Sequence, residues 1–398
     1  MLTQDLLESA RGLSQEIVTL RRSIHAEPEL GLETPKTLAK VRAALADLPL
    51  TWREGPSCTG AIATLEGTTP GRRVLLRGDM DALPMDEKTG LDFASTVPGR
   101  MHACGHDTHT AMLAGAARLL CARQAEISGT VDFMFQPGEE GYHGARHMID
   151  DGLLEPQADA AFALHIMPNA PFGVIGGRAG PLLAAADQFT ITVKGQGGHA
   201  SMPHDCSDPV PAAAAIVSAI QAMVTRRFNA ASAVVVTVTQ IHAGTAHNVI
   251  PDDVTLGGTM RTLSPEHREK VHALIAECAS LTAAAHGVEA SCEIEEGFPV
   301  TICDERAVAL GKSVAQEIGG AEGWRDLADP IMGAEDFSYV LEKVPGAMFF
   351  LGVAKEGEDW RQCCAIHSPR MLVDENALPR GTAMLAGCAL KFLNEGWS

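Results

Sequence analysis

Basic residues are scarce in this sequence of 398 residues. It holds 31 Lys and Arg against 50 Asp and Glu, which gives a formal net charge of −19. A protein that binds nucleic acid needs a basic face to neutralise phosphates, so this balance disfavours a nucleic-acid partner. It disfavours docking on an anionic membrane for the same reason. A local basic pocket for a small anion is still compatible with the overall charge.

Long apolar runs are also missing. No stretch approaches the ~18 uncharged apolar residues of a membrane-spanning helix. The first residues include early acidic side chains and no apolar core typical of a signal peptide. The 10 cysteines follow no disulfide-framework spacing. We therefore expect a cytoplasmic protein whose cysteines are reduced core thiols, with Cys104 as the exception because of its neighbours.

The length exceeds the roughly 250–300 residues of a usual single core, so two domains are expected. Helical and strand patterns alternate in both the N-terminal and the C-terminal part of the chain. The expected helices span 5–25, 34–47, 107–123, 141–151, 304–318, 334–343 and 375–394, and the expected strands span 60–65, 73–77, 130–135, 160–164 and 347–351. This alternation predicts an α/β domain with a mixed sheet flanked by helices, whose ligands bind at the carboxyl ends of strands.

A different pattern occupies residues 187–295. Its elements follow the order β-α-β-β-α-β, the ferredoxin-like unit, which can bury a core of its own. We therefore expect one α/β domain, formed by residues 1–186 and 296–398, with a second domain inserted at 187–295.

The densest group of candidate ligands lies in MHACGHDTHTAM, residues 101–112. Cys104 and His106 stand two apart, just before an expected helix. A thiolate and an imidazole are good ligands for zinc and similar divalent metals. The alternative is a helix-cap region with incidental histidines. Further histidine and aspartate side chains crowd the same dozen residues, which favours the metal site.

Two adjacent carboxylates, Glu139 and Glu140 in QPGEEG, directly follow the strand expected at 130–135. A solvated turn is one interpretation of such a pair. The other is a division of roles, in which one carboxylate ligates metal and its neighbour acts as a general base toward the attacking water.

Three further segments add candidates at strand ends or late in the chain. His165 follows the apolar strand expected at 160–164, although a lone histidine there is more often a core residue. The DMD of GDMDALP supplies Asp79 and Asp81, which could ligate metal or orient a ligating imidazole. His367 in CCAIHSP carries little signal by itself.

Taken together and in order, these motifs resemble the dinuclear metallopeptidase family. That family includes aminoacylases, glutamate carboxypeptidases and bacterial dipeptidases. The similarity is strongest to the branch of hippurate hydrolases, N-acyl-amino-acid amidohydrolases and plant auxin-conjugate hydrolases, and it covers nearly the whole chain. The motifs that carry the resemblance are RRSIHAEPELGLET, GDMDALP, MHACGHD, QPGEEG, LHIMP, GGHASMP, AHNVIPD, GAEDFS and the late His367.

The resemblance implies two divalent metal ions, which could be zinc, manganese, cobalt or nickel. The implied ligands are Cys104 as a bridge, His106 and His165 on one ion, and Glu140 and His367 on the other. Glu139 would be the general base and acid, and Asp81 the carboxylate behind the ligands. Most of the family has histidine where Asp79 stands and aspartate where Cys104 stands. A bridging thiolate is softer than a carboxylate, which leaves the identity of the metal open.

The resemblance also implies roles in the inserted domain, a lid that often dimerises. His199, Asn248 and Arg261 match positions that contact substrate in the family. A histidine donor suits a developing oxyanion, and an arginine fork suits a substrate carboxylate. We expect a homodimer or a higher homo-oligomer, with His199 acting in its own chain or in the neighbouring one.

The function that follows is hydrolysis of an N-acyl amino acid, a small-molecule substrate, at its amide bond. A dipeptidase or carboxypeptidase with the same metals is the alternative within this chemistry. A metal-binding protein without catalysis is the alternative from another class, and the extra carboxylate of Glu139 argues against it because ligation alone does not require it.

Overall fold

The computed structural model describes residues 2–397 and divides into two compact units. The first unit runs to Leu182 and also contains Ile302–Asp329 and the chain from Asp336 onward. The second unit is Leu183–Thr301 with Pro330–Glu335. A short strand pair, β7 (Gly180–Leu183) with β14 (Thr301–Cys303), lies where the chain passes from one unit to the other.

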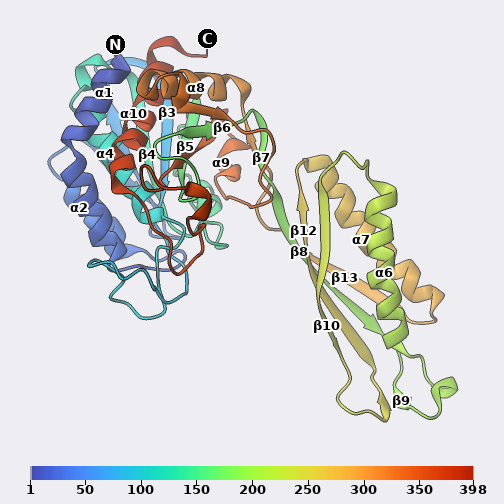
Figure 1. The fold of residues 1–398 in the computed structure, drawn as a ribbon. Helices are drawn as coiled ribbons and strands as arrows, with labels where there is room; N and C mark the ends of the chain where they lie inside the picture. Colours follow the sequence, from blue (N-terminus) through green and yellow to red (C-terminus); the bar gives the residue numbers. More distant parts are fainter. Residues whose placement is uncertain (1, 398) are drawn as a thin grey trace. The chain divides into compact units, whose positions relative to one another are not determined.

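The first unit is built on a mixed sheet of eight strands in the order β1-β2-β4-β3-β5-β16-β6-β15 (Figure 1). Its strands are β1 (Thr51–Glu54), β2 (Ala61–Glu66), β3 (Thr69–Asp79), β4 (Ser128–Gln136), β5 (Ala160–Met167), β6 (Ile175–Gly177), β15 (Trp324–Asp326) and β16 (Gly346–Gly352). Strands β4, β3, β5 and β16 are mutually parallel neighbours. Their carboxyl ends therefore meet at one edge of the sheet, where such folds bind ligands.

Helices cover both faces of this sheet. They are α1 (Leu2–Gly12), α2 (Ser14–His25), α3 (Pro35–Ala44), α4 (His106–Cys121), α5 (Gly144–Asp150), α8 (Glu305–Gly319), α9 (Ser338–Leu341) and α10 (Leu378–Glu395). Successive strand residues point to opposite faces. On β3, a Cβ at Gly78 would lie 2.9 Å from the carbonyl of His109 on α4. The preceding residue on β3, Arg77, points to the opposite face. It donates to Asp336, which also accepts the Ala145 amide of α5.

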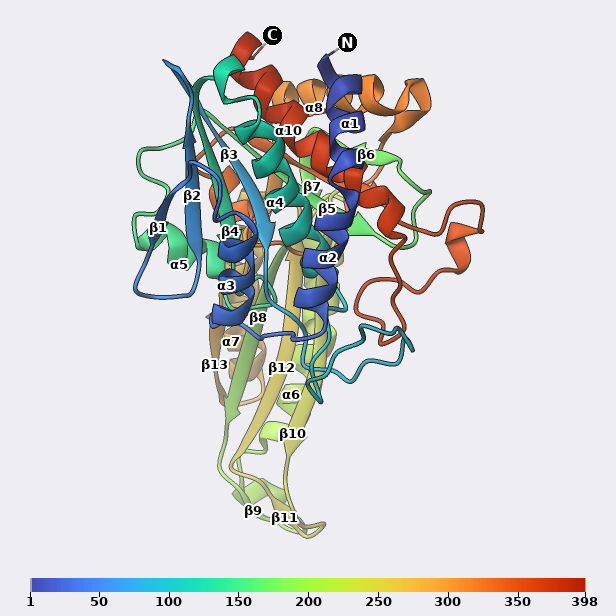
Figure 2. The ribbon, with the colours of Figure 1, turned by 90° about the vertical axis from the view of Figure 1, so that its left-hand side faces the viewer.

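The N-terminal segment differs from the single helix predicted over 5–25. The chain forms α1 and α2, which are interrupted at Leu13, and Figure 2 shows both beside α4 and α10. Gly12 explains the interruption, because glycine in a helix interior costs about 1 kcal/mol relative to alanine. The amphipathic pattern continues across it, with Leu6 and Ile17 both buried.

Residues 334–343 were predicted as one helix, and this prediction was wrong in extent. Only Ser338–Leu341 is helical. The Asp336 carboxylate is drawn into hydrogen bonds with Arg77, Gln136 and the Ala145 amide, and the chain turns at this point.

The second unit has an antiparallel sheet in the order β10-β12-β8-β13 with two helices on one face. Its elements are β8 (Ala185–Lys194), β9 (Gly198–His199), α6 (Pro209–Arg227), β10 (Val234–Ala243), β11 (Val249–Ile250), β12 (Asp253–Thr262), α7 (Pro265–Ala285) and β13 (Glu289–Glu295). Burial alternates along β8, as expected for a sheet covered on one face. By length and composition α6 could cross a membrane. Core helices pass the same test, and α6 packs Ile216 and Ile220 into this core.

Candidate metal centre

The loop that carries Cys104 and His106 leads into α4, which begins at His106. The helix expected at 107–123 therefore begins one residue earlier, and Gly105 occupies its N-cap position with φ +91°. A side chain there would place its Cβ 2.6 Å from Ile166. A glycine is therefore required both by the left-handed backbone and by the contact with β5.

The N-terminal motif RRSIHAEPELGLET supports the start of α4. Arg21 Nε and His25 Nδ1 lie 2.7 and 2.9 Å from the same oxygen of Asp107. All three side chains are buried. Burial opposes protonation of His25, yet the Asp107 carboxylate raises the pKa of His25 to about 9. Asp107, in the first turn of α4, is thus held by two positive side chains from α2.

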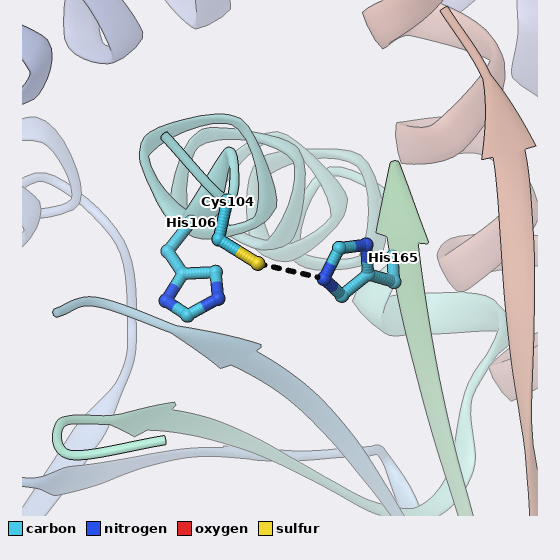
Figure 3. A group of neighbouring side chains, drawn as sticks. All are labelled: Cys104, His106 and His165. Atoms are coloured by element: carbon cyan, nitrogen blue, oxygen red, sulfur yellow. Dashed lines mark hydrogen bonds between the residues drawn. The ribbon is translucent and has the colours of Figure 1, made fainter. Parts of the chain in front are cut away.

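Five of the residues singled out from the sequence come together in two overlapping groups. The ligand atoms of Cys104, His106 and His165 lie within 4.8 Å of one another, as do those of Cys104, Glu140 and His367. Cys104 Sγ is 3.3 Å from His165 Nε2 (Figure 3). Cys104 belongs to both groups, so its thiol is shared by the pair His106 and His165 and the pair Glu140 and His367.

Backbone carbonyls set the tautomers of two of these histidines. His106 Nδ1 lies 2.9 Å from the Asp81 carbonyl, and His165 Nδ1 lies 2.6 Å from the Ile166 carbonyl. A carbonyl only accepts, so in the neutral form of each ring Nδ1 carries the proton and Nε2 keeps its lone pair. This is the arrangement that orients a neutral imidazole as a metal ligand.

The site has the donors and the charge that suit a cation. His106 Nε2 is buried and has no hydrogen-bond partner, which costs about 1–3 kcal/mol for a polar group withdrawn from water. His367 Nε2 lies 3.3 Å from Glu140 Oε1. The closeness of Cys104 and Glu140 raises the pKa of His367 to about 10. Thiolate, imidazole and carboxylate together form a donor set that fits divalent transition metals.

The Asp81 side chain positions the turn that carries the two adjacent glutamates. Asp81 Oδ1 accepts the Glu139 amide at 3.0 Å, and Asp81 Oδ2 accepts the Glu140 amide at 3.1 Å. One carboxylate therefore holds the whole Glu-Glu turn. Glu139 Oε2 and Glu140 Oε1 each lie 3.9 Å from His106 Nε2.

His367 reaches the site from late in the chain, where the sequence pattern had little to say. Its amide donates to the Ala103 carbonyl at 2.7 Å, which ties this loop beside Cys104. The residue adopts φ +64°, a left-handed conformation that is uncommon outside glycine. Its side chain is 51% exposed, so it lies on the solvent side of the group.

A buried hub beneath the site was missed in the sequence. Arg77 donates to Gln136 at 2.9 Å, to Asp79 at 2.5 Å and to Asp336 at 3.0 Å. These contacts join β3, β4 and the GAEDFS segment. The motif RVLLR could have indicated this hub, because an arginine that ends a fully buried strand needs buried partners.

The three residues expected to contact substrate lie in the second unit and fall into two places. His199 on β9 pairs with Val249 on β11, which puts it beside Asn248. Its Nδ1 accepts the Ser201 amide at 3.2 Å, so a neutral His199 carries its proton on Nε2. Arg261 lies near the far end of β12, eight residues from Asp253, or about 25 Å away at the usual strand rise. The structure therefore does not bring Arg261 together with the other two within this unit.

A model of peptidase family M20/M25/M40 matches residues 75–391. This chain belongs to that family. It is therefore an enzyme, a metal-dependent amide hydrolase, and the expected resemblance to dinuclear metallopeptidases is confirmed.

Curated members of the family align over almost the whole chain. The chain is 38% identical to the N-acetylcysteine deacetylase of Bacillus subtilis, with 94% of this chain and 96% of the relative covered. It is 37% identical to the IAA-amino acid hydrolase ILR1-like 2 of Arabidopsis thaliana, with 95% and 85% covered. It is also 37% identical to thermostable carboxypeptidase 1 of Saccharolobus solfataricus, with 99% and 100% covered.

Solved structures show the same fold. A putative aminohydrolase from methicillin-resistant Staphylococcus aureus superposes with a TM-score of 0.92 at 28% identity, covering 98% of this chain and 100% of that chain. A dinuclear metal-binding M20 peptidase from Bacillus subtilis superposes with a TM-score of 0.83 at 34% identity, covering 96% and 99%.

Proposed function

We propose that this enzyme hydrolyses the amide bond of N-acyl amino acids and releases a carboxylic acid and a free amino acid. The observation that carries the proposal is the pair of ligand groups sharing Cys104, with Glu139 beside them. Relatives named as an N-acetylcysteine deacetylase and as IAA-amino acid hydrolases support this class of substrate.

We assign the ligands of two divalent ions to these groups. Cys104 would be shared by both ions, His106 and His165 would complete one site, and Glu140 and His367 would complete the other. The ions would be zinc, manganese, cobalt or nickel, since the donor set combines thiolate and imidazole with a carboxylate. Bound metal would polarise the substrate carbonyl and acidify the attacking water.

The chain's own residues then manage protons and charge. Glu139 takes the proton from the attacking water and returns it to the leaving amine. Asp81 accepts the backbone amide of Glu139, which fixes the turn from which the Glu139 carboxylate projects. His199, with its proton on Nε2, is the donor for the developing oxyanion.

The order of elements in the second unit supports our proposal that this unit is a ferredoxin-like lid and dimerisation domain. Its elements β8-α6-β10-β12-α7-β13 follow that order. Arg261 lies about 25 Å along β12 from Asp253, whereas His199 lies on β9 beside β11, which precedes Asp253 in the chain. One small substrate could not contact both side chains within one chain. We therefore assign His199 to the neighbouring chain's site in a homodimer. Ten free cysteines support a cytoplasmic location.

The substrate's free carboxylate tests this proposal. We expect Arg261 to grip it, so an N-acyl amino acid amide should show a kcat/KM about one to two orders of magnitude below that of the free acid, because a charge-assisted hydrogen bond contributes roughly 1.5–3 kcal/mol. Arg261→Ala should lower hydrolysis of the acid similarly and change the amide little. The measurement is steady-state kinetics on N-acetylmethionine, hippurate and their amides. Equal rates for acid and amide in both enzymes would exclude the clamp.

Action in trans gives a second test. Chains with His199→Ala and chains with Glu139→Gln should each be inactive alone. After subunit exchange, random pairing makes half the dimers hybrids with one complete site each, so activity should recover to about a quarter of wild type. Fluorescently labelled chains would verify exchange. If subunits exchange and activity does not recover, His199 acts in the site of its own chain or takes no part in catalysis.

A carboxypeptidase or dipeptidase activity is the second candidate. The thermostable carboxypeptidase relative, aligned over the whole length of both chains, favours it. The two functions differ in the group attached to the scissile carbonyl. Parallel assays on N-acetyl and on unblocked dipeptide substrates separate them.

A further inference from the structure

A trio of buried side chains shares His106 with the proposed ligands, while its other two members, Asp79 and His109, have no role in the chemistry above. Asp79, His106 and His109 place their possible ligand atoms within 4.8 Å of one another. A third metal site is the obvious interpretation. Two of the three residues, however, are already engaged. Asp79 accepts from Arg77 at 2.5 Å on one oxygen and from His109 at 2.6 Å on the other.

His109 is committed on both sides of its ring. Its Nε2 accepts the amide of Ile166 at 2.9 Å, so the proton must sit on Nδ1, which donates to Asp79. Its Nε2 lone pair is therefore used, and His109 is not available as a ligand. The ring is 2% exposed and its centroid lies 4.5 Å from that of His165.

The contact with Ile166 links His109 to the site. The carbonyl of Ile166 accepts from His165 Nδ1 at 2.6 Å. One residue at the end of β5 is thus held at its amide by His109 and uses its carbonyl to orient His165. Asp79, in turn, is anchored by Arg77 and fixes the tautomer of His109.

We propose that His109 and Asp79 are positioning residues for His165: through Ile166 they hold the Nε2 lone pair of His165 toward Cys104. This rests on the proposed metal site. It also gives Asp79 a role that does not involve ligation. A carboxylate here supplies the acceptor that a histidine ring at this position could not offer to both Arg77 and His109 at once.

The experiment titrates apo-protein with Co²⁺ and follows the cobalt–thiolate charge-transfer band, which reports Cys104 directly. His109→Phe keeps the ring volume and removes both hydrogen bonds. We expect Co²⁺ to bind about 10- to 100-fold more weakly, the usual effect of losing a partner behind a ligand. His109→Gln, whose amide can accept from Ile166 and donate to Asp79, should restore affinity to within a few-fold of wild type.

The control is Thr382→Val. It removes a buried hydrogen bond from α10 to the Met112 carbonyl on α4, the helix that carries His109, and should leave Co²⁺ affinity unchanged. Amide exchange at Ile166 in apo-protein should accelerate in His109→Phe and not in His109→Gln. If His109→Phe does not fold, His109→Asn replaces it, because the shorter amide reaches Asp79 and not Ile166. Wild-type affinity in these variants would overturn the positioning role alone, whereas a wild-type chain that binds no Co²⁺ would overturn the proposed function as well.

Discussion

Glu139→Gln is expected to lower kcat by a factor of about 10² or more, the usual scale of general acid–base catalysis. The substitution keeps the shape of the side chain and the amide that donates to Asp81. Only the ability to accept and return a proton is lost. The bound metal, measured by elemental analysis of the same preparation, should stay at the wild-type level.

The neighbouring residue supplies a matched comparison. Glu140 has the same chemistry, the same turn and an amide held by the other oxygen of Asp81, yet its carboxylate faces His367. Glu140→Gln should therefore lose metal as well as activity. The opposite pattern, with metal lost in Glu139→Gln and retained in Glu140→Gln, would show that the two roles are exchanged.

A fully loaded chain should hold about two equivalents of divalent metal, as two-metal hydrolases do, and removal of the metal with a chelator should abolish hydrolysis. Cys104→Ala should reduce the ratio to one or less, because its thiol belongs to both ligand groups. Oxidation of Cys104 should have the same effect, since the thiolate is the ligand. Elemental analysis and calorimetric titration measure the ratio.

Cys388→Ala is the control for this experiment. Cys388 is another buried free thiol, on α10, and belongs to neither ligand group. It should keep the full ratio and the full activity. A saturating ratio near one that is unchanged by Cys104→Ala would disprove the bridge.

The resemblance and the local patterns together predict much of the candidate site. Cys104 and His106 stand close in sequence and so do Glu139 and Glu140, while His165 ends an apolar strand. Parallel strands bring their carboxyl ends to one edge, which is why motifs about 30 residues apart could be expected to converge. The β-α-β-β-α-β order of 187–295 was likewise visible from spacing alone.

Other parts were not accessible to pattern reasoning. His367 had no flanking strand to mark it, and a hydrogen bond from its amide to the Ala103 carbonyl ties it beside Cys104 in the folded chain. The separation of His199 from Arg261 depends on the register along β12, and a list of motifs does not contain that register. Gly105 became the cap of α4 because Ile166, a residue of another strand, leaves no room for a side chain.

The sequence by itself determined which residue types are available and in which order. With them it determined five of the eight strands of the large sheet, most helices and the contiguous motifs, whereas the short strands β1, β6 and β15 were not predicted. Hydrophobic periodicity acts over a few residues, so a local pattern is enough to predict these elements. Only the tertiary structure decided how Arg77, Asp336, Asp79 and His109 are paired. A buried charge is stable only with a partner, and these partners come from segments up to 259 residues apart, so only the folded chain determines which side chains meet.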